Sequence, residues 1–427
     1  MRRREWRSER NTRAQSACPA RLPEGERRER RGEFMSHHVI VAGGGPAGLL
    51  TALGLAQAGI AVTVLEAAQA ANTSPRAMVY HWPVLPHLER LGILDDCRRI
   101  GFLKQDYGWR FAHTGEMIDW SLECLADEVE RPFNLHLGQD KLSDIVFGHL
   151  AKMSNVTVRM GRKVVDLVQD AGSVTVTVET VDGERETYEG DYLIGSDGAA
   201  SVVREKLLKL NFFGVTWPER FIATNIYCDF ERHGYRRTTM QVDDEQGAII
   251  VKIDDGRFWR VTFMEDAALP SESIEARIHE KFKTLLPPGE SYELVAFSPY
   301  RMHQRAADTM QVGRVLLVGD AGHITNPTGG LGLTSGMFDS FAVVETLKRV
   351  MLDGAAPGLL KDYSDDRRRK FIELVSPRAS QNKLTVFHSA PGKAFDIWTE
   401  RMREIARNKD LQRGALSFTA GLATQFS

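Results

Sequence analysis

The sequence predicts an α/β fold, in which a parallel sheet with covering helices is interrupted by a mostly β insert and followed by C-terminal helices. Two short apolar runs, residues 39–42 and 315–318, each end at a glycine turn that leads into a helical pattern. Such strand–turn–helix units build doubly wound sheets. Between them, residues 211–298 contain several runs of strand-like pattern, which predicts a second, strand-rich domain.

The composition is that of an ordinary globular protein. The 427 residues are 42% hydrophobic and 26% charged, with a net charge of -2, which is enough chain for about two or three domains. The neutral balance and the lack of a basic stripe argue against a nucleic-acid partner. No apolar run approaches the ~18 residues that span a bilayer. The four cysteines are scattered, so we expect no metal site, reduced thiols and a cytoplasmic protein.

Residues 1–34 differ from the rest of the chain. They are rich in arginine, poor in aliphatic residues and without hydrophobic periodicity. The apolar core of a secretory signal is missing, and the glutamates among the arginines argue against a mitochondrial transit peptide. We therefore expect a disordered extension, with the folded protein starting near Met35.

The first strand–turn–helix unit carries a dinucleotide-binding pattern. Residues 43–48 read GGGPAG, a G-x-G-x-x-G sequence. Gly43 allows the tight turn, Gly45 lets a pyrophosphate approach the backbone, and Gly48 lets the helix pack on the strand. A helix and a second strand follow, and Glu66 closes that strand. An acid at this place can accept hydrogen bonds from an adenosine ribose.

Shorter patterns fill the chain up to the insert. A helix is predicted from about residue 140 to 153, and Gln139 directly before it could be a helix cap or a ligand-facing amide. Asp182-Gly183 lies between two alternating runs and predicts a hairpin turn. A buried strand then leads to Ser196-Asp197-Gly198 and a further helix.

The second strand–turn–helix unit places Asp320 at the carboxyl end of a buried strand, where open α/β sheets bind their ligands. A loop of glycine and proline leads into a predicted helix over residues 331–350. Backbone N–H groups at such a helix start can hold partial negative charge on a flat heterocycle. His323 is expected to be structural. The chain after residue 350 is helical and charged, and residues 365–370 are expected to form a solvated face.

Three signals stand in a fixed order: residues 43–48, Ser196-Asp197-Gly198, and Gly319-Asp320 with its loop. In this order they resemble the class A FAD-dependent monooxygenases, the aromatic hydroxylases of the para-hydroxybenzoate hydroxylase type, over residues 35 to about 370. The resemblance implies a Rossmann-like FAD-binding domain of the GR2 type with an inserted, mostly β substrate-binding domain. Its implied boundaries are 35–103 with 135–211 and 303–376 for the FAD-binding domain, 104–134 with 212–302 for the substrate-binding domain, and 377–427 for a C-terminal helical segment.

The resemblance also implies roles for single residues. Glu66 matches the acid that binds the adenosine ribose, Asp320 lies in the motif for the ribityl side of FAD, and Asp197 lies in a motif assigned to both FAD and the pyridine nucleotide. Two candidates are catalytic: the backbone carbonyl at Pro327, which would face the substrate hydroxyl, and Arg260, which would reach from the substrate domain toward the flavin. The other FAD-binding candidates are Gly43, Gly45, Pro46, Ala47, Gly48, Arg76, Gln139, Gly330, Leu331, Gly332, Leu333 and Thr334.

The sequence departs from the family pattern at several positions. Ala200 stands where the family usually has arginine, Asn326 replaces one proline of a pair, and Thr334 replaces an asparagine near the flavin ring. These departures leave the cofactor motifs in place but define the substrate less closely. No catalytic base can be named from the sequence.

The resemblance implies a monooxygenase that uses FAD, NADPH or NADH, and O2 to hydroxylate a phenolic or other electron-rich aromatic substrate through a flavin C4a-hydroperoxide. Only one dinucleotide fingerprint is present, so we expect NAD(P)H to dock transiently on a monomer or homodimer. Two alternatives stay open at this point. One is a flavin-dependent reductase or dehydrogenase, and the other is a non-enzymatic FAD-binding redox module.

Overall fold

The central sheet has six strands in the spatial order β18-β19-β12-β1-β2-β8. All neighbours are parallel except β18 and β19, which are antiparallel. The strands are β1 (His38–Ala42), β2 (Ala61–Glu66), β8 (Val156–Met160), β12 (Tyr192–Gly195), β18 (Gln311–Val312) and β19 (Val315–Leu317). The two apolar runs predicted as strands form β1 and β19, and their apolar side chains are buried.

The structure is a computed structural model and describes residues 37–70 and 78–426. The extension predicted at residues 1–34, and Arg76, lie outside the described residues. Within the described part the α/β class is confirmed, with a parallel sheet, a large antiparallel sheet and helices at the C-terminal end. The domain boundaries given above stay a prediction.

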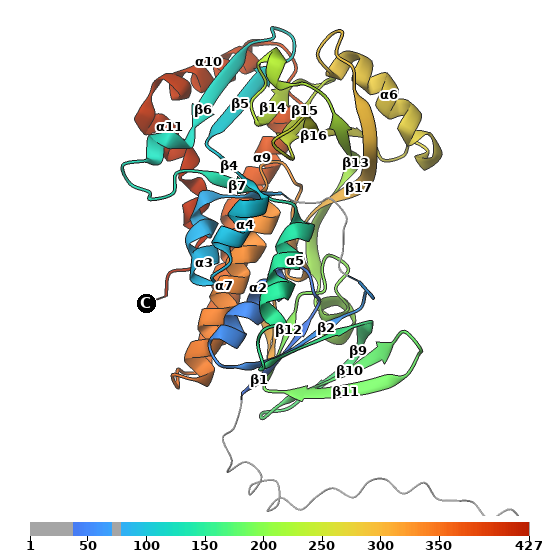
Figure 1. The fold of residues 1–427 in the computed structure, drawn as a ribbon, viewed down its shortest axis with the longest axis vertical. Coiled ribbons are helices and arrows are strands. Elements are labelled where there is room, and N and C mark those ends of the chain that lie inside the picture. The colour runs from blue at the N-terminus through green and yellow to red at the C-terminus, as the bar shows by residue number, and fades with distance from the viewer. Residues whose placement is uncertain (1–36, 71–77, 427) are drawn as a thin grey trace, which may run out of the picture. The chain divides into compact units, whose positions relative to one another are not determined.

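Helices α2 and α7 lie side by side next to the central sheet (Figure 1). They are α2 (Pro46–Gln57) and α7 (Leu331–Met351), and α5 (Gln139–Leu150) packs on α2 from another side. The absence of a side chain at Gly54 allows the close approach of α2 to α7, because a Cβ there would lie 2.9 Å from a methyl group of Val344. Gln139 does not precede its helix, as predicted, but is the first residue of α5, since the preceding Gly138 is already the cap residue.

A three-stranded antiparallel sheet contains the predicted hairpin. Its strands are β9 (Arg162–Gln169), β10 (Val174–Thr180) and β11 (Arg185–Gly190). The turn between β10 and β11 holds Gly183 at a φ of +79°, a conformation that glycine adopts without strain. The hairpin at Asp182-Gly183 is therefore confirmed.

The strands of the insert and β20, which follows it, form one eight-stranded sheet in the order β20-β17-β13-β16-β15-β14-β5-β6. The strands are β5 (Asp106–Phe111), β6 (Met117–Ser121), β13 (Phe212–Tyr227), β14 (Thr238–Val242), β15 (Ala248–Lys252), β16 (Phe258–Asp266), β17 (Glu293–Ala307) and β20 (His323–Ile324). One face is covered by α6 (Ile274–Leu285), whose Ile278 and Phe282 pack on Ile222 and Val261 of the sheet. The opposite face contacts strand β3 and the C-terminal helix α9.

Shorter elements connect these units. A small sheet in the order β3-β7-β4 contains β3 (Val79–Tyr80), β7 (Asn134–His136) and β4 (Phe102–Lys104). The short helical elements are η1 (Trp82–Val84), α3 (Leu85–Arg90), α4 (Leu94–Ile100), η2 (Leu122–Leu125), η3 (Val203–Leu207), η4 (Glu231–His233), η5 (Ser271–Ser273) and η6 (Gly319–Ala321).

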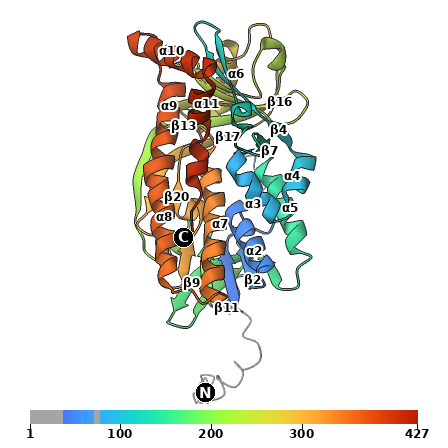
Figure 2. The same cartoon turned by 90° about the vertical axis from the view of Figure 1, so that its left-hand side faces the viewer.

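The chain after α7 is helical, and its first part is one continuous column (Figure 2). The elements are α8 (Gly358–Lys370), η7 (Phe371–Val375), α9 (Ser376–Phe387), α10 (Lys393–Arg407), α11 (Lys409–Leu416) and η8 (Phe418–Leu422). The solvated face predicted at residues 365–370 is wrong for Arg367, which is fully buried, and for Lys370, which is also buried. The reason is helical spacing, because Leu360, Tyr363 and Arg367 lie on the same buried side of α8.

Candidate active site

Two of the three motif glycines in the first turn are required by packing. Gly43 has a φ of +109°, and a Cβ there would lie 2.4 Å from the backbone oxygen of Ser196. At Gly48 a Cβ would lie 2.1 Å from the carbonyl oxygen of Gly43 and 2.4 Å from Oγ of Ser196. The ends of β1 and β12 and the start of α2 can therefore meet only without side chains at these two positions.

The third glycine, Gly45, has no such neighbour. Its backbone is extended, with φ -76° and ψ 173°, and a Cβ there would find no atom within 4 Å. Gly45 is the cap residue of α2, which has no side-chain cap and no acid in its first turn. Free N–H groups and open space at a helix start fit a pyrophosphate.

Glu66 stands next to this turn at the end of β2. Its Oε2 accepts a hydrogen bond from the backbone N–H of Gly44 at 2.6 Å, and its Oε1 accepts one from Ala68 N–H at 2.7 Å. Each carboxylate oxygen keeps a second lone pair. The carboxylate is therefore held in place and can still accept hydrogen bonds from sugar hydroxyls.

Ser196 and Asp197 brace the glycine turn and the turn that follows β12. The Ser196 hydroxyl donates to the carbonyl oxygens of Ala42 at 2.8 Å and Gly43 at 3.0 Å. The Asp197 carboxylate accepts from the Ser201 hydroxyl and from the Val203 N–H. Burial raises the pKa of Asp197 above its usual value, and these hydrogen bonds offset part of that rise. In this structure the Asp197 carboxylate therefore binds groups of the protein itself and holds the turn after β12 in place.

Gly319 and Asp320 follow β19 and lie against the start of α2. Gly319 has a φ of +57°, and a Cβ there would lie 3.0 Å from Cβ of Ala47. Its N–H donates to Oδ2 of the buried Asp339 at 2.9 Å. The side chain of Asp320 is exposed. The structure thus brings Asp320 close to the predicted pyrophosphate turn.

The start of α7 offers a second open helix end. Gly329 and Gly330 have φ values of +98° and +69°, and Gly330 is the cap residue, with no side-chain cap and no acid in the first turn. The backbone N–H groups of Leu331, Gly332 and Leu333 begin the helix and have no partner within it. They are suited to partial negative charge on a ligand.

Thr334 is fully buried in the first turns of α7 and already has partners. Its hydroxyl donates to the carbonyl oxygen of Gly330 at 3.1 Å and lies 2.7 Å from Nδ1 of His81. Burial lowers the pKa of His81 to about 4, and nearby Lys104 adds to the effect. His81 is therefore neutral near pH 7 and supports the glycine turn from the side.

The loop before α7 fixes the carbonyl group of Pro327. Asn326 is buried, its Nδ2 donates to Oε1 of Gln304 at 3.1 Å, and its Oδ1 accepts from the Thr328 N–H at 3.0 Å. The Pro327 carbonyl oxygen accepts from Gly330 N–H at 3.0 Å, which leaves one lone pair. Asparagine in place of the usual proline thus closes the loop by its own hydrogen bonds.

Arg260 lies on the inner face of the insert sheet, opposite to α6. In the antiparallel register it pairs with Asn225 on one side and Val251 on the other, and paired residues share a face. Its Nε donates to Oδ1 of Asn225 at 3.1 Å. Burial raises the pKa of Tyr300, and the nearby charge of Arg260 counteracts part of this rise.

Residues 36–377 match the model of a protein family described as "FAD binding domain". The chain belongs to this family. It is 54% identical over 392 residues to the 6-hydroxy-3-succinoylpyridine 3-monooxygenase HspB of Pseudomonas putida (strain DSM 28022 / S16), covering 91% of this chain and 99% of that protein. It is 41% identical over 361 residues to the para-nitrophenol 4-monooxygenase of Pseudomonas sp. (strain WBC-3), covering 83% of this chain and 88% of that protein.

A solved structure has the same fold. The p-nitrophenol 4-monooxygenase PnpA from Pseudomonas putida DLL-E4 superposes with a TM-score of 0.86 at 36% identity, over 92% of this chain and 99% of that one. Together with the family match, these relatives show a flavoprotein monooxygenase that binds FAD, uses NAD(P)H and O2, and acts on an aromatic substrate. The two open helix ends and the empty space at Gly45 fit that cofactor.

The predicted FAD contact of Gln139 stays a prediction. Gln139 is half-buried in the first turn of α5, and only its backbone oxygen has a described partner, the Ser143 hydroxyl at 3.1 Å.

Within residues 37–70 and 78–426, no helix is long and apolar enough to cross a membrane. The same part of the chain has no group of three or more His, Cys, Asp or Glu side chains that could hold a metal ion.

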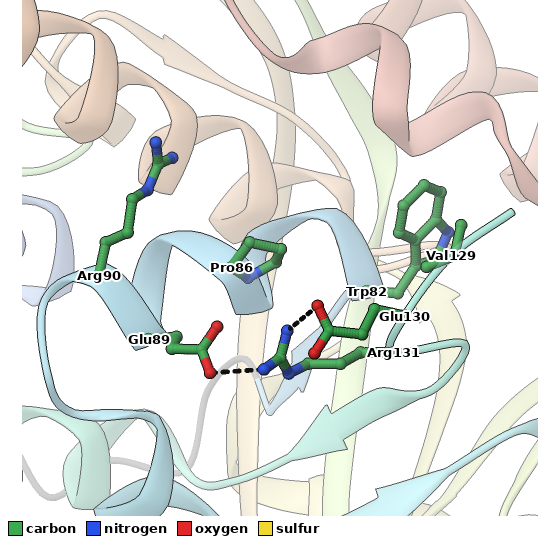
Figure 3. A pocket seen from close by; sticks show the side chains of 7 residues that line it. All are labelled: Trp82, Pro86, Glu89, Arg90, Val129, Glu130 and Arg131. Atoms are coloured by element: carbon green, nitrogen blue, oxygen red, sulfur yellow. Dashed lines mark hydrogen bonds and ion pairs between the residues drawn. The ribbon is translucent and has the colours of Figure 1, made fainter.

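A surface pocket beside α3 contains none of the predicted site residues (Figure 3). It is lined by Trp82, Pro86, Glu89, Arg90, Val129, Glu130 and Arg131. Arg131 points toward Glu89 and Glu130 and forms ion pairs with both, at 2.5 and 3.1 Å. Since none of the predicted site residues lines it, we do not assign this pocket to FAD.

The sequence interpretation missed three residues that hold the site together: His81, Asp339 and Arg367. A lone histidine carries no recognisable pattern, so nothing in the sequence singled out His81. Arg367 could have been found, since it falls seven residues after Leu360 on the buried side of α8. Asp339 could have been found with it, because an acid on the buried face of α7 needs a basic partner.

Proposed function

We propose that the substrate of this monooxygenase is a hydroxylated aromatic ring with a second substituent para to the hydroxyl group, and that oxygen is inserted at the substituted carbon. The observation that carries this proposal is the position of oxygen insertion in the names of both relatives. One is a 3-monooxygenase of a ring with the succinoyl group at position 3, and the other is a 4-monooxygenase of para-nitrophenol. In each ring the substituted carbon lies para to the hydroxyl-bearing one.

Ionisation of such a hydroxyl group directs electron density to the para carbon, which is where an electrophilic oxygen would attack. FAD, once reduced by NAD(P)H, supplies the activation of O2. The protein must then bind the ring close to the flavin, favour the ionised hydroxyl group and keep water out.

The inner face of the insert sheet is suited to this task. Around Arg260 it presents an apolar cluster with the buried residues Phe221, Ile249, Val251 and Met302 and the partly buried Tyr300. Met78, directly before strand β3, and Val386 and Phe387 of helix α9 belong to the same cluster. We place the substrate ring here, with Arg260 favouring the ionised hydroxyl group and the Pro327 carbonyl facing it.

The assignment of FAD contacts is part of the same proposal. Gly45 and the start of α2 bind the pyrophosphate, Glu66 the adenosine ribose, and Asp320 the ribityl side, while the start of α7 faces the flavin ring. Arg76, Gln139 and Asp197 remain candidates. A monomeric or dimeric state and a cytoplasmic location also remain predictions.

The test is a comparison of ring isomers. Purified enzyme with FAD and NAD(P)H is given 6-hydroxy-3-succinoylpyridine, para-nitrophenol or meta-nitrophenol, and O2 consumption, product mass and released nitrite are measured. The para-substituted rings should be converted, the pyridine fastest, with one atom of labelled oxygen in the ring product. With para-nitrophenol, O2 and NAD(P)H should give benzoquinone, nitrite, water and NAD(P)+. Conversion of meta-nitrophenol at an equal rate, or oxygen insertion only at an unsubstituted carbon, would contradict the proposal.

A further inference from the structure

Asp339 of α7 is a fully buried carboxylate whose oxygens have partners on three sides. Its Oδ2 accepts from the Gly319 N–H at 2.9 Å and from Nε2 of His323 at 2.7 Å. Its Oδ1 accepts from Nε of Arg367 at 2.7 Å. Although burial acts to raise the pKa of Asp339, His323 and Arg367 hold it below the usual value, so the carboxylate is ionised. One side chain thus connects helices α7 and α8 to the turn that contains Asp320.

Arg367 is equally buried, and its remaining N–H groups reach the C-terminal tail, which we define as residues 421–424. Nη1 donates to the carbonyl oxygen of Leu422 at 2.5 Å and to the Thr424 hydroxyl at 3.3 Å. Lys370, one turn further along α8, donates to the carbonyl oxygens of Gly421 at 2.9 Å and Ala423 at 2.7 Å. Leu422 is fully buried. The tail is therefore tied to α8 by consecutive backbone carbonyl groups.

Further groups hold the backbone around Gly319. Nη1 of Arg204 donates to the Ala321 carbonyl at 3.0 Å, and the Tyr363 hydroxyl donates to the Leu317 carbonyl at 2.7 Å. The Ser340 hydroxyl, one residue after Asp339, donates to the Ala47 carbonyl in the first turn of α2 at 2.8 Å. The turn before Asp320 and the pyrophosphate helix are thus positioned by the same segment of α7.

We infer that the C-terminal tail belongs to the FAD-binding apparatus, because through Arg367 and Asp339 it fixes the Gly319 turn that presents Asp320 to the sugar chain of the cofactor. The inference rests on the proposed placement of Asp320. Arg367 and Asp339 act as positioning residues, since they lie behind the turn. A buried ion pair suits this task. Because an unpaired buried charge is strongly disfavoured, the two side chains stay in contact and keep the turn in one position.

The inference predicts different effects on the binding of the two halves of FAD. ADP contains only the adenosine and pyrophosphate half, which the proposal places at Gly45 and Glu66. Loss of the Arg367 contacts should disturb the turn at Gly319 and leave that half unchanged. General damage to the fold would weaken ADP and FAD alike.

The experiment measures the dissociation constants of FAD and ADP for full-length apo-enzyme, with FAD by fluorescence quenching and ADP by competition. Arg367→Gln should weaken FAD at least about tenfold, which corresponds to losing a charge-assisted contact, and change ADP binding less than twofold. Arg367→Lys should recover part of the FAD affinity. The matched control is Arg369→Gln, an exposed arginine on the same helix with surface ion pairs to Asp366 and Glu373. It should leave both constants unchanged.

Variants of the tail test the same connection from its other end. Thr424→Val removes the hydrogen bond from Arg367 and the one that the Thr424 hydroxyl donates to Asp366. It should weaken FAD by about threefold, with a change in the visible circular dichroism of the bound flavin. This variant keeps the buried ion pair, so it gives an answer even where Arg367→Gln does not fold.

Unchanged FAD affinity in folded Arg367→Gln, or in Thr424→Val where the former is unfolded, overturns the inference. Equal weakening of FAD and ADP also overturns it, since that result describes general damage. Asp320→Ala distinguishes this failure from that of the proposed site. If Asp320→Ala binds FAD normally, the placement of Asp320 is wrong. If it binds FAD weakly while the Arg367 and Thr424 variants bind normally, only the tail inference fails.

Discussion

Gly45 and Gly48 belong to the same turn but meet different surroundings. The backbone at Gly45 has a conformation that any residue adopts, and a side chain there would enter open space. Gly45→Ala should therefore leave the melting temperature of the apo-enzyme unchanged or slightly raised. It should weaken FAD about ten- to a hundredfold, because the methyl group occupies the space of the pyrophosphate. Fluorescence titration with FAD and thermal melts of the apo-enzyme measure the two effects.

Gly48→Ala is the matched comparison. Its Cβ would lie 2.1 Å from a backbone oxygen, so this variant should lose stability, by roughly 1–3 kcal/mol or more as at other overpacked sites. If Gly45→Ala binds FAD as tightly as the wild type, the assignment of the pyrophosphate site is wrong.

His81 makes stability depend on pH. Its pKa is about 4 in the folded protein against 6.5 for the ordinary group. Below pH 6.5, His81 is therefore protonated in the unfolded chain but stays neutral in the folded protein. The stabilising contribution is complete above pH 6.5 and is lost as the pH falls toward 4, by up to about 3 kcal/mol.

His81→Gln keeps a hydrogen-bonding group beside Thr334 but cannot be charged. We expect its stability in urea to fall less steeply than that of the wild type between pH 6.5 and 4.5. Identical slopes for the two proteins in this interval would show that His81 does not carry the effect.

Strands β13 and β16 place Asn225 and Arg260 opposite each other at the centre of the insert sheet. Because this charge is buried in an apolar cluster, Arg260→Met should lower substrate-stimulated NAD(P)H oxidation about ten- to a hundredfold, as expected for a lost contact to a charged group. FAD content should stay the same, since the cofactor contacts come from other elements. Steady-state oxidation rates and the flavin absorbance of the purified variant measure both.

Arg257→Met provides the control, because Arg257 is exposed just before the same strand. Equal rates for Arg260→Met and Arg257→Met would remove Arg260 from the substrate site.

The elements show why part of the fold was predictable. Strand β1, the glycine turn and helix α2 depend on neighbours close in sequence, and the spacing of apolar residues and glycines predicts them. The pattern predicts that α8 is a helix. The many charges in residues 365–370 suggest a solvated face when only the composition of the run is considered. The side of α8 that is buried depends on α7 and on the tail, which local pattern does not reveal unless the position of each charge on the helix is followed.

On the scale of the whole molecule, the family match begins at residue 36, and the 54% identical relative is covered over 99% of its length by 91% of this chain. Deletion of residues 1–34 should therefore leave FAD content and the melting temperature unchanged. Thermal melts of both forms with FAD measure this. A fall of several degrees, equivalent to roughly 1 kcal/mol or more in a chain of this size, would contradict the prediction.

The site as a whole was only partly predictable. The motifs predict Gly45, Glu66 and Asp320 as site residues from local backbone pattern, and the structure brings all three to the start of α2. Their contacts with FAD stay a prediction. His81 and Asp339 act through contacts between segments that are distant in sequence, such as His81 with Thr334. Contacts of this kind arise from tertiary packing and leave no local periodicity.

The hydrogen bond from Ser196 to Ala42 spans 154 positions, and this has a consequence for protein synthesis. At about 5–20 residues per second, a ribosome needs roughly 8–30 s to extend the chain from the first glycine turn to the residue that closes it. The Asp339 contact and the tail follow later still. The FAD-binding site of a nascent chain is therefore incomplete until nearly the whole chain has emerged from the ribosome. FAD can therefore bind only once almost the whole polypeptide has been made.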